Sequence, residues 1–309
     1  MGLNTFKLQS YDIIGDVHGH ATLLEKLLQE LGYKKNHGAY SHPSRQAIFV
    51  GDIIDKGPEI REALSIVRSM VDSGSAQMVL GNHEVNAIGW QYPDTDGDYL
   101  RKRTDKNRKQ HQETLDAFPD SKEQMANAKW FQTLPLSLDL GGIRVVHAAW
   151  NDEFHKEAGK IPYETFSLLY AFCEYIPARA RYEVLCKGYE TELPDGLTFK
   201  DDKGIERKHL RTKWWKGAAG RTYRDLTLDE SLPAPDVPVI DPKLPQEDYS
   251  GDVPVFFGHY AANPNKLIMT PKVACLDYGI FNGAPLYAYR WDGEKELNSS
   301  KIVKMPHKR

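Results

Sequence analysis

The chain has 309 residues, of which 40% are hydrophobic and 27% charged, a composition typical of one globular domain with room for a sizeable insertion. Its formal net charge of -3 argues against a general nucleic-acid-binding surface, because such surfaces carry a strong basic excess. No apolar run is long enough to span a membrane, and residues 1–10 lack the apolar stretch of a signal peptide, so we expect no membrane association. The three cysteines have no CxxC spacing, which argues against a disulfide framework and favours the cytoplasm.

Apolar strands and amphipathic helices alternate in the first third of the chain. A helix with its leucines on one face is expected around Leu23 to Leu31, and a second between Pro58 and Gly74. Residues 33–45 are expected to form a loop. This alternation indicates a mainly parallel α/β layer. The strands expected in this part are residues 11–14, 47–50 and 77–80.

The rest of the chain is expected to add insertions to the same domain, which we take to span residues 1–309. Residues 92–128 are polar and predicted to be helical. Residues 151–250 are predicted to be a variable insertion over the sheet edge, helical within 163–189 and extended within 232–245. Further strands are expected at residues 144–146, 255–257, 273–276 and 286–289.

Polar residues follow the core strands directly, and the densest cluster is the segment 51–58. Because the carboxyl ends of strands in open α/β sheets meet at one edge, these residues should lie together. The set offers oxygen and imidazole donors without thiolates, which suits manganese, iron or zinc. Six groups are too many for one catalytic ion with an open position, whereas two ions about 3.5–4 Å apart can share them and clamp an in-line displacement. The six residues are Asp16, His18, Asp52, Asn82, His147 and His259.

The motifs around these residues resemble those of the calcineurin-like metallophosphoesterases. They are most similar to the phosphoprotein-phosphatase branch and its bacterial members, which include symmetrical dinucleoside tetraphosphatases. The resemblance implies an α/β fold with two central mixed β-sheets flanked by helices, a four-layer sandwich, and an inserted cap-like segment. The motifs are Gly-Asp-Val-His-Gly at 15–19, Gly-Asp-Ile-Ile-Asp-Lys-Gly at 51–57 and Gly-Asn-His-Glu at 81–84, followed in order by Val146-His147-Ala148 and Gly258-His259.

The resemblance also implies a role for each residue. Asp16 and His18 would hold one metal ion, and Asp52 would bridge it to a second. His83 would be the general acid rather than a ligand, with its ring oriented by Asp55. A hydroxide that bridges the metals would attack phosphorus directly, without a phosphoenzyme. The second ion would be completed by Asn82, His147 and His259, and the phosphate would contact Lys56 and Asn82.

The sequence departs from the family pattern in two places. Lys56 occupies a position where the family's protein phosphatases usually have arginine, and lysine is a mobile point charge rather than a bidentate grip. Ala148 and Ala149 replace the two glycines that usually follow the histidine ligand, which crowds the nearby backbone. A second phosphate-binding arginine is not assignable by alignment. The candidates are Arg211, Arg221 and Arg224.

Three features have two interpretations each. The basic run at 101–109 is either a solvated helix face or a contact for nucleic acid or polyphosphate. The stretch 211–216 places cations beside Trp214 and Trp215, which either stack on a base or cover the mouth of the site. The alternative is that one tryptophan packs in the core and the lysines are exposed. Glu84 either supports the site from behind or serves a salt bridge or the helix dipole.

The leading interpretation is a phosphoesterase that uses two divalent ions, manganese first and iron or zinc as alternatives, to hydrolyse phosphomonoesters of proteins, nucleotides or small molecules. The second is a symmetrical dinucleoside polyphosphate hydrolase, in which the aromatic insertion holds adenine and the basic helix the phosphates. The third is a non-catalytic module that binds phosphate or nucleic acid, and the intact set of ligands argues against it. A phosphorylated substrate is the expected partner, without dedicated nucleic-acid binding. The physiological substrate and the oligomeric state stay open.

Overall fold

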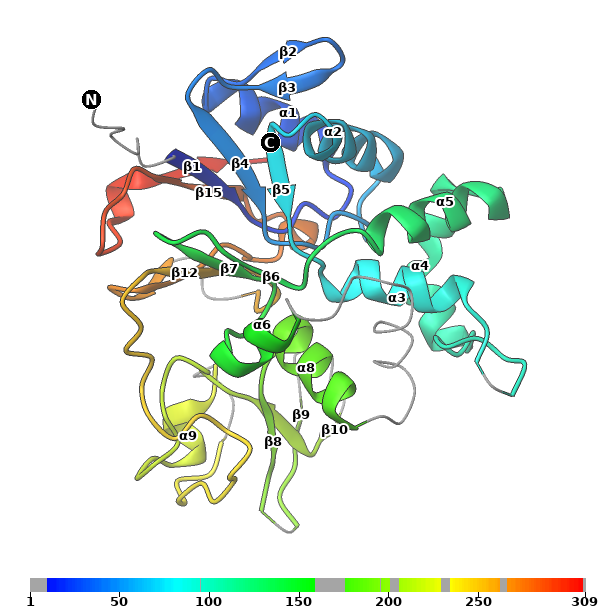
Figure 1. The fold of residues 1–309 in the computed structure, drawn as a ribbon. Coiled ribbons are helices and arrows are strands. Elements are labelled where there is room, and N and C mark those ends of the chain that lie inside the picture. Colours follow the sequence, from blue (N-terminus) through cyan, green and yellow to red (C-terminus); the bar gives the residue numbers. More distant parts are fainter. Residues whose placement is uncertain are drawn as a thin grey trace.

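The computed structural model describes residues 10–94, 96–158, 176–194, 196–200, 206–228, 234–261 and 266–307, arranged around two five-stranded sheets (Figure 1). In the first sheet β1, β4 and β5 are parallel, β15 runs antiparallel to β1, and the edge strand β16 runs antiparallel to β15. Its strands, in spatial order, are β16 (Ile302–Met305), β15 (Leu286–Trp291), β1 (Ser10–Ile14), β4 (Arg45–Phe49) and β5 (Ala76–Met78).

The second sheet has the same mixed character. Its three inner strands are parallel, and an antiparallel strand lies at each edge. In spatial order the strands are β13 (Ile268–Thr270), β14 (Val273–Cys275), β12 (Val255–Phe257), β7 (Arg144–Val146) and β6 (Ser137–Asp139). The predicted pair of mixed sheets is confirmed.

The two sheets pack face to face, and since successive side chains of a strand point to opposite faces, every second residue of a core strand points to the other sheet. Ile13 and Ile48 of the first sheet share one apolar cluster with Val145 and Phe256 of the second. Phe49, the residue after Ile48, belongs instead to a cluster with the outer helices. Each sheet is therefore buried on both faces, which explains why the strands read as continuous apolar runs.

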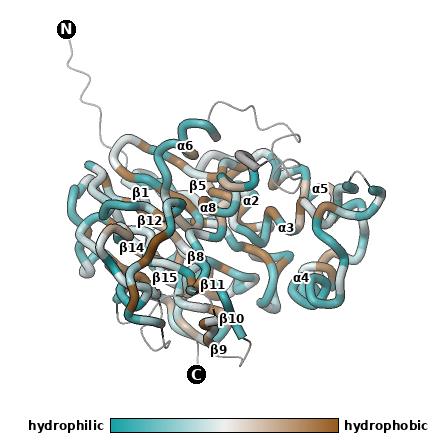
Figure 2. Tube along the Cα trace, turned by 90° about the horizontal axis from the view of Figure 1, so that it is seen from below, coloured by the Kyte–Doolittle hydropathy of each residue, from teal (hydrophilic) through white to brown (hydrophobic). Residues whose placement is uncertain are grey.

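Helices cover the outer face of the first sheet (Figure 1). Helix α1 (Ala21–Glu30) packs on β15 and β16, and α2 (Ile60–Asp72) packs on β5. Beyond them lie α3 (Asn82–Gln91), α4 (Asp105–Ala117) and α5 (Ser121–Phe131), with α5 against α3 and α4 against α2. Figure 2 shows α4 as mostly hydrophilic, in keeping with the polar composition of residues 92–128.

The expected loop at 33–45 is wrong in part, because the chain forms a small hairpin there. Strands β2 (Lys34–Asn36) and β3 (Ala39–Ser41) are joined by His37 and Gly38, whose φ angles of 49° and 91° suit a two-residue hairpin turn. The sequence pattern concealed this hairpin because the residues of β2 are polar and all exposed, so no alternation marks the strand.

The outer face of the second sheet is covered by the segment between β7 and β12. Trp214 and Trp215 are 2% and 3% exposed and pack on Phe257, so both tryptophans, rather than the one expected, belong to the core. Of the helix expected within 163–189, residues 176–187 are helical, and 159–175 lie outside the described residues. The described part of 232–245 contains no helix. The elements are α6 (Asp152–Ala158), α8 (Ile176–Lys187), β8 (Glu190–Glu192), β9 (Phe199–Lys200), β10 (Glu206–Arg207), β11 (His209–Arg211) and α9 (Tyr223–Leu226), and two short 3-10 helices, η1 (Ile280–Asn282) and η2 (Ser299–Lys301), lie near the C-terminal end.

Within the described ranges, none of the helices combines the length and apolar character needed to cross a bilayer.

Candidate active site

The six candidate ligands come from loops at the carboxyl ends of parallel strands in both sheets. Asp16 and His18 follow β1, and Asp52 follows β4. Asn82, in the loop after β5, is the first residue of α3. The second sheet contributes the residues that follow β7 and β12, which are His147 and His259.

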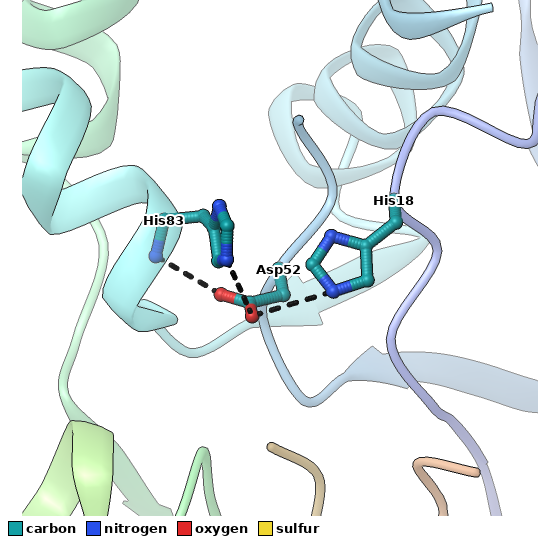
Figure 3. A group of neighbouring side chains, drawn as sticks. All are labelled: His18, Asp52 and His83. Carbon is teal, nitrogen blue, oxygen red and sulfur yellow. Dashed lines mark hydrogen bonds and ion pairs between the residues drawn. The ribbon is translucent and has the colours of Figure 1, made fainter. Parts of the chain in front are cut away.

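Asp52 lies between His18 and His83 (Figure 3). Its Oδ2 is 3.6 Å from Nε2 of His18, and its Oδ1 is 3.4 Å from Nε2 of His147. Asp52 therefore belongs to two groups of donor atoms, each compact enough to hold a metal ion: one with His18 and His83, the other with His147 and His259. A carboxylate shared in this way is the arrangement that two neighbouring cations require.

Backbone carbonyls fix the orientation of two of the imidazoles. Nδ1 of His18 donates to the carbonyl of Ile54 at 3.0 Å, and Nδ1 of His147 donates to that of Val50 at 2.8 Å. Each ring therefore presents Nε2 to Asp52, which is how an outer hydrogen bond orients a metal-binding histidine.

The electrostatics of the two rings differ. Burial lowers the pKa of His18 to about 3, so this ring is neutral, as a ligand must be. Burial alone would also lower the pKa of His147, but the charges of Asp52 and Asp16 raise it to about 10. The carboxylates that favour a proton on His147 favour a divalent cation in its place.

Among the six candidate ligands, two buried side-chain atoms have no hydrogen-bond partner within the described parts of the chain: Oδ1 of Asp16 and Nε2 of His259. The other Asp16 oxygen accepts from the backbone N–H of His259 at 3.1 Å, so the Asp16 carboxylate lies against the loop that bears His259. Unpaired buried acceptors are costly, and a cation would satisfy both. A Cβ on Gly258 would lie 2.0 Å from Asp16 Oδ1, which explains the glycine before the histidine. The donor set thus fits divalent metal ions.

The backbone of these loops is strained. Several non-glycine residues have φ in the left-handed region, which side chains with a Cβ adopt at a cost of order 1–3 kcal/mol each. Such strain persists only where the surrounding structure enforces it. The residues and their φ angles are His18 (42°), Asp52 (52°), Asp55 (66°), Lys56 (67°) and His259 (65°).

The side chain that enforces the strained turn after β4 is Glu84. This carboxylate is fully buried and accepts the backbone N–H groups of Asp52, Ile53 and Ile54 at 2.9, 2.8 and 3.4 Å. It also accepts the N–H of Gly81 at 3.0 Å. Of the interpretations open for Glu84, the structure thus favours support of the site, because one side chain ties the loop that bears Asp52 to the loop that bears Asn82.

His83 and Asp55 form a close pair beside the Asp52 carboxylate. Nδ1 of His83 is 2.5 Å from Oδ2 of Asp55, and its Nε2 is 3.8 Å from Oδ2 of Asp52. Burial alone would lower the pKa of His83, but Asp52 and Asp55 raise it and so favour the imidazolium. The second oxygen of Asp55 accepts from Nδ1 of His111 at 2.8 Å and from the hydroxyl of Thr114. These two residues of α4 were not predicted from the sequence. The only indication of them in the sequence is a histidine and a threonine one turn apart in a polar helix.

A cleft of about 620 Å³ opens beside His83, with Asp55, Lys56 and Asn82 in its wall. Nζ of Lys56 lies 3.9 Å from the centre of the Phe281 ring and 3.3 Å from Nε2 of His18. Three further cations contribute to the wall of this cleft: Arg101, Lys106 and Lys109.

The three arginines that alignment left open lie in different surroundings. Arg221 pairs with Asp248, and Arg224 lies 3.6 Å from Asp236 on the surface. Arg211 lies 5.5 Å from the ring centre of Tyr260, and after burial its charge is the largest cause that lowers the pKa of His259. Only Arg211, among these three, is therefore next to the candidate metal ligands.

The family follows from comparison with known proteins. A model of the calcineurin-like phosphoesterase family matches residues 10–262, and the chain belongs to that family. An asymmetrical bis(5'-nucleosyl)-tetraphosphatase from Halalkalibacterium halodurans is 46% identical over 74 residues, which are 24% of this chain and only 30% of that protein. A symmetrical bis(5'-nucleosyl)-tetraphosphatase from Vibrio parahaemolyticus is 26% identical over 291 residues, 92% of this chain and 96% of that protein.

A solved protein serine/threonine phosphatase from Saccharomyces cerevisiae has the same fold. It superposes with a TM-score of 0.52 at 14% identity, over 99% of this chain and 82% of that one.

Replacing Glu84 by Gln should loosen both loops. The amide would point an N–H₂ group at backbone donors, leaving at least one of them unpaired, at a cost of about 1–3 kcal/mol of unfolding free energy. Displaced ligands should weaken Mn²⁺ binding about 10–100-fold. Urea denaturation and calorimetric titration with Mn²⁺ measure the two effects. The control is Glu62→Gln, on the exposed side of α2, and equal behaviour of the two variants would contradict the role given to Glu84.

Proposed function

We propose that this protein is a phosphoesterase that uses two divalent metal ions, with His83 as the general acid. The observation that carries the proposal is Asp52, whose two oxygens face two separate groups of donors while His83, backed by Asp55, lies on the cleft side. Membership of the calcineurin-like phosphoesterase family supports this proposal. The donors for the metal ions and the pair of His83 and Asp55 also occur in one site.

The ligand assignment follows from the positions of the donors. Asp16 and His18 serve the first ion, and Asp52 is shared. Manganese is our first choice, with iron or zinc as alternatives, because the donors are oxygens and imidazole nitrogens. The remaining ligands, for the second ion, are Asn82, His147 and His259. Nε2 of His147 and Oδ1 of Asn82 are 3.1 Å apart, close enough to share that ion.

Two ions bound there would polarise the phosphoryl group and lower the pKa of a water near the phosphorus. The chain itself places a proton donor against the leaving group. Asp55 accepts the Nδ1 proton of His83, so the proton on Nε2 is the one that passes to the departing oxygen. Lys56 and Arg211 supply the positive charges that orient the phosphoryl oxygens.

His83 lies near enough to His18 and Asp52 to act as a ligand instead. The unpartnered oxygen of Asp16 makes that role unnecessary, because it supplies the first ion with a further donor. Asp55 also holds His83 toward the cleft, where a leaving group would be. We therefore keep His83 as the acid.

Phosphomonoesters are the general substrate class, and one observation favours dinucleoside polyphosphates as a second candidate. In the part of the chain that the structure describes, Lys106 and Lys109 have no ion-pair partner, although they line the cleft beside the acid. If His83 protonates the leaving group of a polyphosphate substrate, the phosphate chain of that group would contact these two lysines. Relatives that match this chain are named as tetraphosphatases, one symmetrical and one asymmetrical. The buried Trp214 and Trp215 are not free to stack on adenine.

A non-catalytic binding module is less well supported, because a degenerate site generally lacks a ligand or the acid. All six donors and His83 are present here. We propose that the protein is located in the cytoplasm, because the chain has few cysteines. Cys186 and Cys275 are both buried in the structure.

The roles of His83 and Asp52 are separable by substitution. His83→Asn should lower kcat on phenyl phosphate, whose leaving group needs a proton, by about 10²–10⁴-fold, because proton donation contributes that much. It should retain the metal content of the wild type, measured by plasma mass spectrometry. Asp52→Asn should lose both activity and metal. Loss of one ion in His83→Asn would make His83 a ligand, and full activity of either variant would contradict the mechanism.

The two substrate classes are separable at the basic wall of the cleft. Changing Lys106 and Lys109 together to Gln should raise KM for diadenosine tetraphosphate about tenfold, and change KM for p-nitrophenyl phosphate less than about twofold, because only the first substrate carries a long polyanion. The matched control is Lys102→Gln, which lies on the same segment but pairs with Asp94. Preference of the wild type for a phosphoserine peptide over diadenosine tetraphosphate would remove the dinucleotide candidate.

A further inference from the structure

Helix α4 reaches the proton donor through a set of hydrogen bonds on Asp55. One carboxylate oxygen of Asp55 accepts from His83, and the other accepts from His111 and from Thr114. The hydroxyl of Thr114 is also bonded by the backbone N–H of Asp55 at 3.1 Å. Asp55 is 2% exposed and His111 is 6% exposed, so water does not compete for these bonds.

We propose that His111 is a positioning residue for the general acid: from α4 it holds the Asp55 carboxylate in the rotation that aims its free oxygen at Nδ1 of His83. The inference rests on the proposed function of His83 and goes beyond it, because it gives a role in the reaction to a helix of the polar insertion.

The geometry explains why Asp55 needs this support. The torsion that turns an aspartate carboxylate is soft, so hydrogen bonds rather than rotamer preference determine its plane. Asp55 also lies in a strained turn, with φ at 66°. Two donors on one oxygen from the same helix fix the plane and leave the second oxygen for His83.

The ring of His111 is itself held in place. It packs against Trp90, whose ring centre is 5.6 Å away. Trp90 belongs to α3, the helix that carries His83. The donor, its carboxylate and the supporting imidazole are thus fixed by two helices, and α4 also presents Lys106 and Lys109 to the cleft.

A purely structural histidine would behave differently from a positioning one. If His111 only filled the core, its removal would lower the folded fraction and reduce turnover of every substrate equally. If His111 positions the acid, its removal should lower turnover most for the substrates whose leaving groups most need a proton. Leaving groups of high pKa need the proton, whereas leaving groups of low pKa depart as anions.

The test compares variants over aryl phosphates of graded leaving-group pKa. We expect His111→Ala to lower kcat about tenfold on phenyl phosphate, part of the 10²–10⁴-fold that proton donation contributes, and less than about twofold on 2,4-dinitrophenyl phosphate. His111→Asn should recover most of the loss, because its amide N–H can reach the place of Nδ1. Thr114→Val is a second variant with the same expected direction. The control is Asp116→Ala, on the exposed side of α4.

A second readout does not depend on turnover. The proton between His83 and Asp55 should give a low-field NMR signal in the wild type that His83→Asn removes. In His111→Ala the signal should move upfield or disappear through exchange, and in Asp116→Ala it should stay.

Equal loss on all leaving groups, or an unchanged NMR signal in His111→Ala, would overturn the inference. Failure of the proposed function looks different. A wild type that hydrolyses none of these esters contradicts the function, and the NMR comparison still decides whether His111 positions the pair.

Discussion

The turn after β4, which belongs to the candidate metal site, is strained, and the Glu84 carboxylate stabilises it. The residues after β4 must leave a buried strand, place Asp52 between two groups of imidazoles and still satisfy their backbone N–H groups away from water. Glu84 solves this by accepting three of those N–H groups and one from the loop after β5. A single buried side chain thus fixes the relative positions of Asp52 and Asn82, and the rest of the site is arranged around them.

The sandwich of two sheets explains why the site has two halves. The first sheet provides Asp16, His18 and Asp52 from adjacent parallel strands. The second sheet provides His147 and His259 from two parallel neighbours. Because the sheets pack through a continuous apolar layer, the distance between the two halves is set by the core rather than by loops. Rigid placement of this kind is what preorganised catalysis requires.

Much of this site could be predicted because its residues follow strands that read as plain apolar runs. Asp52 and His147 are recognisable by position alone, and the motifs added His83. The supporting groups were not recognisable in the same way. Glu84 acts through backbone groups some thirty positions earlier, and His111 sits in a helix whose polar sequence resembles any solvated surface. The position of Arg211 depends on how the segment after β7 packs. That segment has no periodic sequence pattern from which its packing could be predicted. Similarly, the hairpin after α1 lacks alternation and was taken for a loop.

The central claim is that two cations share the Asp52 carboxylate. Anomalous diffraction from crystals soaked in Mn²⁺ tests it most directly. The account predicts two peaks about 3.5–4 Å apart, one on the side of His18 and one on the side of His147, with an oxygen of Asp52 between them. A single peak, or peaks that do not touch Asp52, would contradict it.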